Sequence, residues 1–240
     1  MSITKETPVS EVATAWPTSI RILERYGIDY CCGGSKPLGD ACREKGVSTD
    51  QLLAEIEKAQ QAADAPRTRN WDSATASELI AHILEKHHAY LRTEFPRLTQ
   101  LLAKVLEAHG ATHGESLRPL RDVYGALRGE LEQHMWKEET ILFPFVEQME
   151  RAKVSGRAQD LQGMSVHSPI VMMEQEHESA GNALREMRRL TADYRLPEDG
   201  CRTYQALLDG LQTLEADLHE HIHLENNILF PNAVKLEESL

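Results

Sequence analysis

Aromatic residues are scarce in this chain of 240 residues, cysteines are few, and negative charges outnumber positive ones. Aromatic side chains make up 5% of the chain, and its four cysteines form no Cys-x-x-Cys pair. Four cysteines are too few for a disulfide scaffold in a chain of this length, so we expect reduced thiols. The 26 Lys and Arg residues against 38 Asp and Glu residues leave a net charge of −12, which argues against nucleic acid as a partner.

Long apolar runs are also missing. No segment approaches the roughly 20 consecutive apolar residues that a membrane-spanning helix needs. The first eight residues, MSITKETP, do not contain the apolar core of a signal peptide. We therefore expect a cytoplasmic protein that does not associate with a membrane. Histidine, in contrast, is abundant, with 11 residues.

The apolar residues recur with the period of helices, and no segment alternates as a strand does. Residues 66–75 interrupt this periodicity, so we expect a small helical domain over residues 1–66 and a larger domain over residues 72–240. The apolar periodicity of the larger domain predicts an antiparallel four-helix bundle, and the expected fold class is therefore all-α. The expected helices span residues 17–26, 38–45 and 48–64 in the small domain and residues 73–108, 116–150, 169–194 and 201–236 in the bundle.

One segment of the bundle recurs with every spacing unchanged. Each copy has two leucines, a His-x-x-x-Glu pair and the sequence ILFP: Leu127, Leu131, His134, Glu138 and 141–144, then Leu214, Leu218, His221, Glu225 and 228–231. Steps of four and three residues place these side chains on one stripe of each helix, and such a stripe faces the interior of a bundle. Both His-x-x-x-Glu pairs are therefore expected to point inward.

The other two helices of the bundle share a Glu-x-x-His sequence. It stands at Glu85 and His88 and again at Glu174 and His177, with apolar residues at helical steps around each histidine. The bundle thus looks like two copies of one helix pair, in which a lone histidine precedes a His-x-x-x-Glu pair. His87 is an alternative to its neighbour as the lone histidine of the first helix.

Four imidazoles and two carboxylates in one core suit a pair of first-row transition metals. An unpaired carboxylate in an apolar stripe costs on the order of several kcal/mol or stays protonated, and a bound metal removes that cost. Iron is the natural candidate, although the donor types alone also suit zinc or manganese. Six protein ligands for two metals leave positions open for exogenous molecules, so we expect a reactive site rather than a structural one.

The bundle resembles the hemerythrin-like di-iron domain. Together with the preceding sequence DYCCGG at 29–34, it is similar over essentially the whole chain to the iron-sulfur cluster repair di-iron family. In that family the first helix carries a His-x5-His pattern, which His82 and His88 match. The resemblance implies two iron ions per chain, bridged by Glu138 and Glu225. It implies six iron ligands, which are His88, His134, Glu138, His177, His221 and Glu225.

The resemblance also implies a function, the repair of iron-sulfur clusters damaged by oxidative or nitrosative stress through iron donation, handling of nitric oxide, or both. Damaged iron-sulfur proteins and nitric oxide or oxygen would be the partners, and the chain would form a homodimer. The residues do not decide whether the protein turns over as an enzyme. One alternative is a sensor that binds oxygen or nitric oxide reversibly. Another is a ferroxidase of the ferritin type, with Glu85 and Glu174 as further ligands.

Cys31 and Cys32 are followed by two glycines, and adjacent cysteines do not easily form a disulfide with each other. We expect one of the two thiolates to relay redox equivalents or iron. The alternative is a glycine-rich turn in which the cysteines are incidental.

The remaining histidines receive no catalytic assignment. His219 and His223 lie away from the His221 stripe and are expected on a solvated face of the helix. The residues His109, His113 and His167 lie in predicted connections, and we assign them no role.

Overall fold

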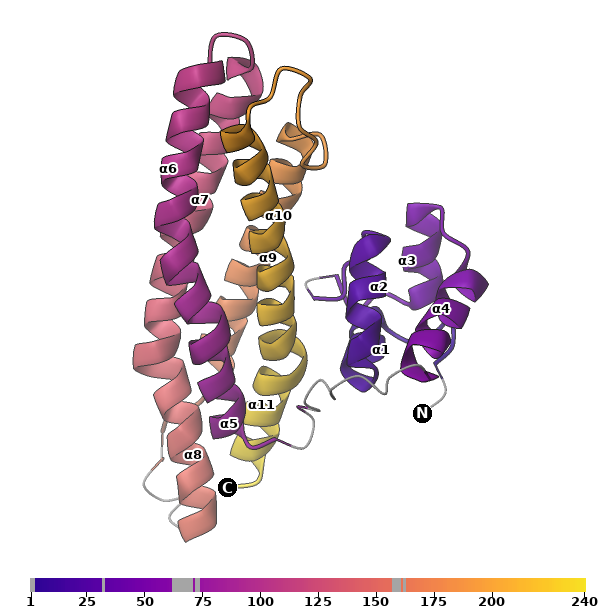
Figure 1. Cartoon of the computed structure of the whole chain (residues 1–240). Helices are drawn as coiled ribbons and strands as arrows, with labels where there is room; N and C mark the ends of the chain where they lie inside the picture. The colour runs from indigo at the N-terminus through magenta and orange to yellow at the C-terminus, as the bar shows by residue number, and fades with distance from the viewer. Residues whose placement is uncertain (1–2, 32, 62–70, 72–73, 157–160, 162) are drawn as a thin grey trace. The chain divides into compact units, whose positions relative to one another are not determined.

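The computed structural model of the protein describes residues 3–31, 33–61, 71, 74–156, 161 and 163–240. In these ranges the chain is helical, which confirms the all-α class, and it forms no strand beyond an isolated bridge between Pro8 and Pro37 (Figure 1). No helix within the described ranges has the length and apolarity that crossing a membrane requires. Contacts divide the chain into a first unit of residues 1–79 with 219–239 and a second unit of residues 80–218 with residue 240. The predicted boundary between residues 66 and 72 lies largely outside the described residues and stays a prediction.

Four long helical segments form the antiparallel bundle that the sequence predicted (Figure 1). Each segment is amphipathic and buries one apolar stripe, such as Leu91, Phe95 and Leu98 in the first segment. The fourth segment passes from the second unit into the first between Leu218 and His219. The segments are α5 (Ala76–His82), η3 (Ile83–His88) and α6 (Ala89–His109); α7 (Gly114–Lys137), η4 (Glu138–Leu142) and α8 (Phe143–Ser155); α9 (His167–Leu190); and α10 (Arg202–Leu224), η6 (Glu225–Leu229) and α11 (Phe230–Glu238).

The elements η3, η4 and η6 are π-helical turns within these segments. Both η4 and η6 begin at the glutamate of a His-x-x-x-Glu pair and end two residues before a proline, Pro144 or Pro231. Proline lacks an N–H, and its ring clashes with the carbonyl four residues earlier, so a wider preceding turn accommodates it. The repeated ILFP sequence therefore explains two of the π-turns, a type of turn that is frequent at functional sites.

The small helical module of the first unit has a core of its own. Side chains from its helices, among them Val12, Leu23 and Leu52, are completely buried. Gly27 and Gly46 follow two of its helices in the left-handed region, with φ of +64° and +66°, as the predicted helix ends require. The sequence did not predict α1, because seven residues are too few to show a helical period. The module comprises α1 (Val9–Ala15), η1 (Pro17–Ser19), α2 (Ile20–Arg25), α3 (Leu38–Lys45) and α4 (Thr49–Gln61).

Candidate metal centre

The six residues that the sequence predicted as metal ligands are all buried. None of them is more than 1% exposed, and they are His88, His134, Glu138, His177, His221 and Glu225. Burial of an ionised carboxylate is costly unless a positive charge or a metal compensates it. Two buried glutamates beside four buried imidazoles are therefore a donor set that fits a transition-metal site.

Within the second unit, η3, α7, η4 and α9 bring four of these side chains together. The Nε2 atoms of His134 and His177 lie 3.0 Å apart. Atom Oε2 of Glu138 lies 3.4 Å from Nε2 of His88 and 3.4 Å from Nε2 of His134. Ring nitrogens from two different segments therefore lie beside the same carboxylate.

The fourth segment carries the other two side chains one helical turn apart, with Nε2 of His221 2.9 Å from Oε1 of Glu225. The donor atoms of the six residues form two groups of four, and within each group all atoms lie within 4.8 Å of one another. Both groups contain Glu138 and Glu225. The residues that complete them are His88 and His221 in one group and His134 and His177 in the other. Two groups that share two carboxylates suit a pair of metal ions.

Two further carboxylates, which the sequence did not predict as part of the site, contact the other ring nitrogen of two of these histidines. Oε1 of Glu139 lies 2.7 Å from Nδ1 of His88, and Oε2 of Glu176 lies 2.8 Å from Nδ1 of His134. A carboxylate beside Nδ1 holds the proton on that nitrogen and fixes the orientation of the ring. Nε2 of each histidine is thereby left as the atom that can bind a metal.

Each outer carboxylate is also held by a cation. Arg92 donates hydrogen bonds to both oxygens of Glu139, and Nζ of Lys137 donates one to Glu176. Partial burial raises the pKa of each carboxyl group, but the hydrogen bonds from the histidine and the cation outweigh burial and hold both pKa values below their usual range. Both carboxylates are therefore ionised at neutral pH and stabilise the orientation of the imidazoles.

His87 makes contacts of a different kind. Its Nδ1 lies 3.0 Å from Oδ1 of Asp217 on α10, and its ring lies edge-on to that of His82 with 5.8 Å between centroids. His87 belongs to neither group of four. A buried histidine that a carboxylate satisfies is an ordinary structural feature, so this geometry favours His88 as the ligand.

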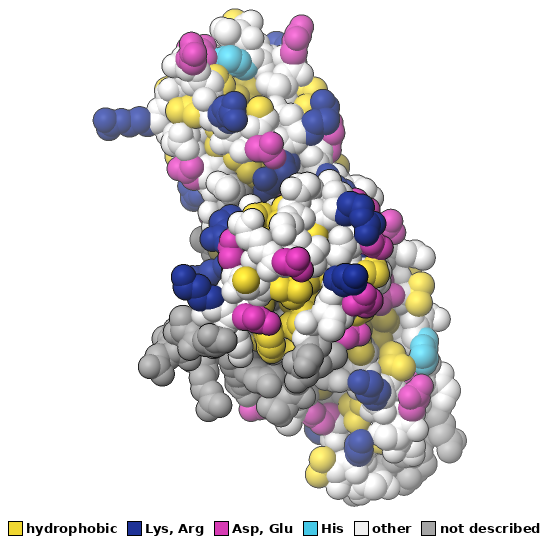
Figure 2. All heavy atoms as spheres, turned by 90° about the vertical axis from the view of Figure 1, so that its right-hand side faces the viewer, with side chains coloured by type: hydrophobic (Ala, Val, Ile, Leu, Met, Phe, Trp, Pro, Cys, Tyr) yellow, Lys and Arg dark blue, Asp and Glu magenta, His cyan; other side chains and the backbone are white. Residues whose placement is uncertain are grey.

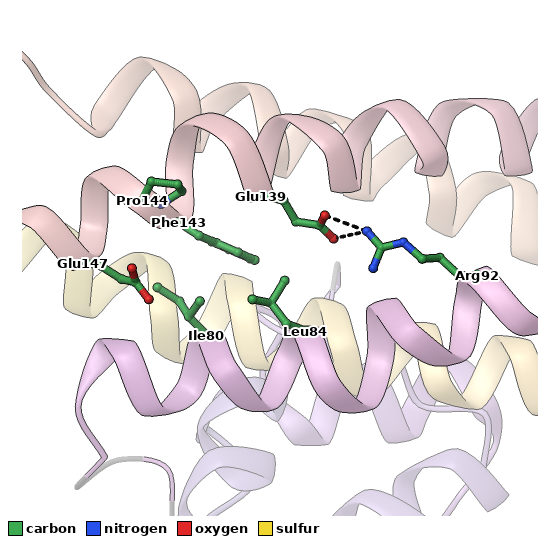
Figure 3. A pocket seen from close by; sticks show the side chains of 7 residues that line it. All are labelled: Ile80, Leu84, Arg92, Glu139, Phe143, Pro144 and Glu147. Atoms are coloured by element: carbon green, nitrogen blue, oxygen red, sulfur yellow. Dashed lines mark hydrogen bonds and ion pairs between the residues drawn. The ribbon is translucent and has the colours of Figure 1, made fainter.

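A surface pocket has a volume of about 330 Å³, and two of the residues that line it contact His88 (Figure 3). Glu139 is one of them, and the other is Phe143, whose ring stacks on the imidazole with 5.9 Å between centroids. Figure 3 shows the ion pair of Glu139 with Arg92 at one side of the pocket and the apolar side chains of Ile80 and Leu84 beside it. The lining is therefore mixed, with the charged side chains of Arg92, Glu139 and Glu147 beside apolar ones.

The vicinal cysteines are described only in part, because Cys32 lies outside the described residues. Cys31 is buried, and its N–H and its thiol both donate to Oδ1 of Asp29, at 3.0 and 3.3 Å. A Cβ atom at Gly34 would lie 2.6 Å from the carbonyl oxygen of Tyr30, so the turn itself needs this glycine. The relay role of Cys31 and Cys32 stays a prediction.

The prediction that His223 lies on a solvated face was wrong. It is 2% exposed, and its ring lies 5.4 Å from that of Tyr30 in the same unit. The side-chain amide of Asn227 donates to Nδ1 of His223 at 2.9 Å and to the carbonyl oxygen of Tyr30 at 3.4 Å. Burial lowers the pKa of His223 to about 4, so its imidazole is neutral at neutral pH. Helical spacing identifies the stripe that faces the bundle interior, and it does not show that the opposite face is buried within the first unit.

Comparison with known proteins agrees with this fold and this donor set. A model of the hemerythrin HHE cation binding domain matches residues 79–233, and a model of a domain of unknown function, DUF542, matches residues 5–60. The fold and the site therefore define a protein of the hemerythrin class.

Relatives along the whole chain narrow this class. A protein named iron-sulfur cluster repair protein YtfE from Pectobacterium carotovorum subsp. carotovorum (strain PC1) is 36% identical to this chain, over 97% of this chain and 99% of the relative. A protein of the same name from Edwardsiella ictaluri (strain 93-146) is also 36% identical, over 96% of this chain and 97% of the relative. The protein of the same name in Escherichia coli O81 (strain ED1a) is 35% identical, over 96% and 97%. The chain belongs to this family of hemerythrin-domain iron-sulfur cluster repair proteins.

Proposed function

We propose that this protein binds two iron ions per chain and repairs iron-sulfur clusters damaged by oxidative or nitrosative stress. The observation that carries the proposal is the sharing of Glu138 and Glu225 between two groups of four buried donors. The family to which the chain belongs supports it, because its relatives are named as repair proteins.

In this proposal, each group of four donors holds one iron ion. His88 and His221 would hold one ion, His134 and His177 would hold the other, and Glu138 and Glu225, which belong to both groups, would be shared between them. Bound iron supplies redox chemistry and, for a damaged cluster, a source of metal. The protein contributes a buried donor set and, through Glu139 and Glu176, fixed orientations of His88 and His134.

Nitric oxide or oxygen would approach through the pocket beside His88. The apolar side chains of Ile80, Leu84 and Phe143 would accept a small uncharged molecule there, and Glu139, which also lines the pocket, contacts the buried imidazole. A cytoplasmic location and a homodimer stay predictions, as does the relay of iron or redox equivalents by the vicinal cysteines.

Neither alternative function is favoured. A ferroxidase of the ferritin type would use Glu85 and Glu174 as ligands, but both are exposed and neither belongs to a group of buried donors. A sensor would bind oxygen or nitric oxide without repairing a cluster, whereas the relatives are named for repair.

A repair assay tests the proposed function. Protein loaded with ⁵⁷Fe is expected to restore activity to an iron-sulfur dehydratase whose cluster has been damaged by peroxide or nitric oxide, and Mössbauer spectra of the repaired enzyme are expected to contain the isotope. Free ferrous iron at the same concentration is the control for unassisted reconstitution. Recovery no greater than with free iron would contradict the proposal, and reversible binding of nitric oxide without recovery would support the sensor. Full activity of the Cys31→Ser, Cys32→Ser double variant would contradict the relay alone.

A matched pair of variants tests the choice between adjacent histidines. We expect His88→Gln protein to keep one of two iron ions, because His88 belongs to one group of donors, and His87→Gln protein to keep both. Iron per chain is measured after anaerobic loading and gel filtration, and circular dichroism checks that both variants fold. The opposite pattern would make His87 the ligand.

A further inference from the structure

A second cluster of metal-binding side chains lies at the end of the bundle that carries the α6–α7 and α9–α10 connections (Figure 1). Donor atoms of His109, His113 and Asp199 lie within 4.8 Å of one another. Along α6, His109 is about 30 Å from His88 at 1.5 Å of rise per residue, so this cluster is separate from the six-residue centre.

The two histidines come from a single tight turn. His109 is the last residue of α6, and the backbone N–H of His113 donates to its carbonyl oxygen at 2.7 Å. The carbonyl oxygen of His113 in turn accepts the N–H of Leu117 in the first turn of α7, at 3.0 Å. The separation of the two imidazoles, 6.2 Å between centroids, is therefore set by helix ends on both sides of the turn.

Asp199 brings the carboxylate from a distant part of the chain. Its Oδ1 lies 2.7 Å from Nε2 of His113. The buried ring of Tyr204, in the first turn of α10, lies 5.4 Å from the ring of His109 and 6.1 Å from that of His113. Both imidazoles thus lie close to one buried aromatic side chain. This contact restricts their rotamers before an ion binds, so binding costs less conformational entropy.

Cys201 adds a sulfur atom beside this cluster. It is the residue before α10 and it is exposed, and hydrogen bonding with the neighbouring His109 lowers the pKa of its thiol to about 7. The side chains of His113 and Asp199 are 24% and 53% exposed, so an ion from solvent can reach the cluster. Figure 2 shows one face of the molecule, with histidine side chains in cyan at its surface.

We propose that His109, His113 and Asp199 bind a divalent ion of the Zn²⁺ class, with Cys201 as the fourth donor. Two imidazoles, one carboxylate and one thiolate suit Zn²⁺ and its substitute Co²⁺, whereas Ca²⁺ and Mg²⁺ require oxygen ligands. The ion would connect the α6–α7 turn to the start of α10, so its role is structural, and the proposal does not depend on the iron centre.

Zinc titration of the iron-loaded protein by calorimetry tests the site. We expect one Zn²⁺ per chain to bind without loss of iron and to raise the unfolding temperature. We expect His113→Ala and Asp199→Ala to weaken the binding by more than about tenfold, because each removes a ligand. His167→Ala is the matched control, since His167 lies outside the cluster at the start of α9, and it is expected to bind Zn²⁺ as the wild type does.

Cobalt distinguishes the thiolate from the other donors. Co²⁺ bound to the iron-loaded protein is expected to give a near-ultraviolet thiolate charge-transfer band that Cys201→Ser abolishes. A wild-type protein without that band would overturn the assignment of Cys201. Three results would overturn the site. They are zinc that binds only by displacing iron, zinc affinity unchanged in His113→Ala and Asp199→Ala, and zinc affinity weakened equally in His167→Ala.

Discussion

Glu138→Leu protein is expected to lose both iron ions and with them its repair activity. Glu138 belongs to both groups of donors, so its loss removes a ligand from each ion. Its side chain is completely buried between helices, and leucine fills a similar volume without a donor atom. Iron per chain after anaerobic loading with Fe(II), together with optical and EPR spectra, measures the effect.

The control is Glu132→Leu, a substitution in α7, on the same helical segment. Glu132 is exposed, and its carboxylate pairs with Arg128 one turn away at the surface. This variant is expected to bind iron as the wild type does, because surface pairs of this kind contribute little. Stoichiometric iron in Glu138→Leu protein would mean that the repeated stripe serves packing, and the proposed function would then fail with it.

The helices of the bundle and the buried histidines and glutamates of the candidate site could be predicted because one sequence pattern encodes both. A stripe of leucines at helical steps places His134 and Glu138 inward, and its copy places His221 and Glu225 inward. The leucines of this stripe exclude water, and a carboxylate buried among them needs a counter-charge or a metal. Local periodicity therefore predicts the fold and points to the chemistry at the same time.

The outer carboxylates could not be predicted in this way. Glu139 and Glu176 are each adjacent in sequence to a buried donor, and they resemble the many other glutamates on exposed helix faces. What distinguishes them is contact across the bundle, with partners 51 and 42 residues away. Contacts of this range depend on how helices pack and have no local signature. The same reason explains the missed cluster at the bundle end, where His113 and Asp199 are 86 residues apart.

The π-turns illustrate an intermediate case. The ILFP repeat is visible in the sequence, but its meaning depends on the backbone, because proline two residues beyond Leu142 or Leu229 widens the turn that carries each glutamate. A stripe drawn with 3.6 residues per turn places Glu138 and Glu225 on the inner face without this widening. The pattern thus predicts which side chains are buried, while the π-turns adjust where the carboxylates lie.

Removal of iron is expected to lower the unfolding temperature of the wild-type protein by about 10 to 20 °C. An ion at 100 times its dissociation constant stabilises the folded state by about 2.7 kcal/mol, so two sites contribute about 5 kcal/mol. For a chain of this size, 1 kcal/mol corresponds to about 2 to 4 °C. Scanning calorimetry of loaded and chelator-treated protein measures the difference.

The same experiment on variants separates metal binding from packing. Glu132→Leu protein is expected to show the full wild-type difference, and Glu138→Leu protein is expected to show none. Metal-free Glu138→Leu protein is also expected to unfold at a higher temperature than metal-free wild type, because an apolar side chain replaces a carboxylate that is completely buried. The buried glutamates would then cost stability in the absence of iron, which is the behaviour of residues retained for metal binding. If iron-loaded and metal-free wild type unfolded at the same temperature, metal binding would not contribute to the stability of the bundle.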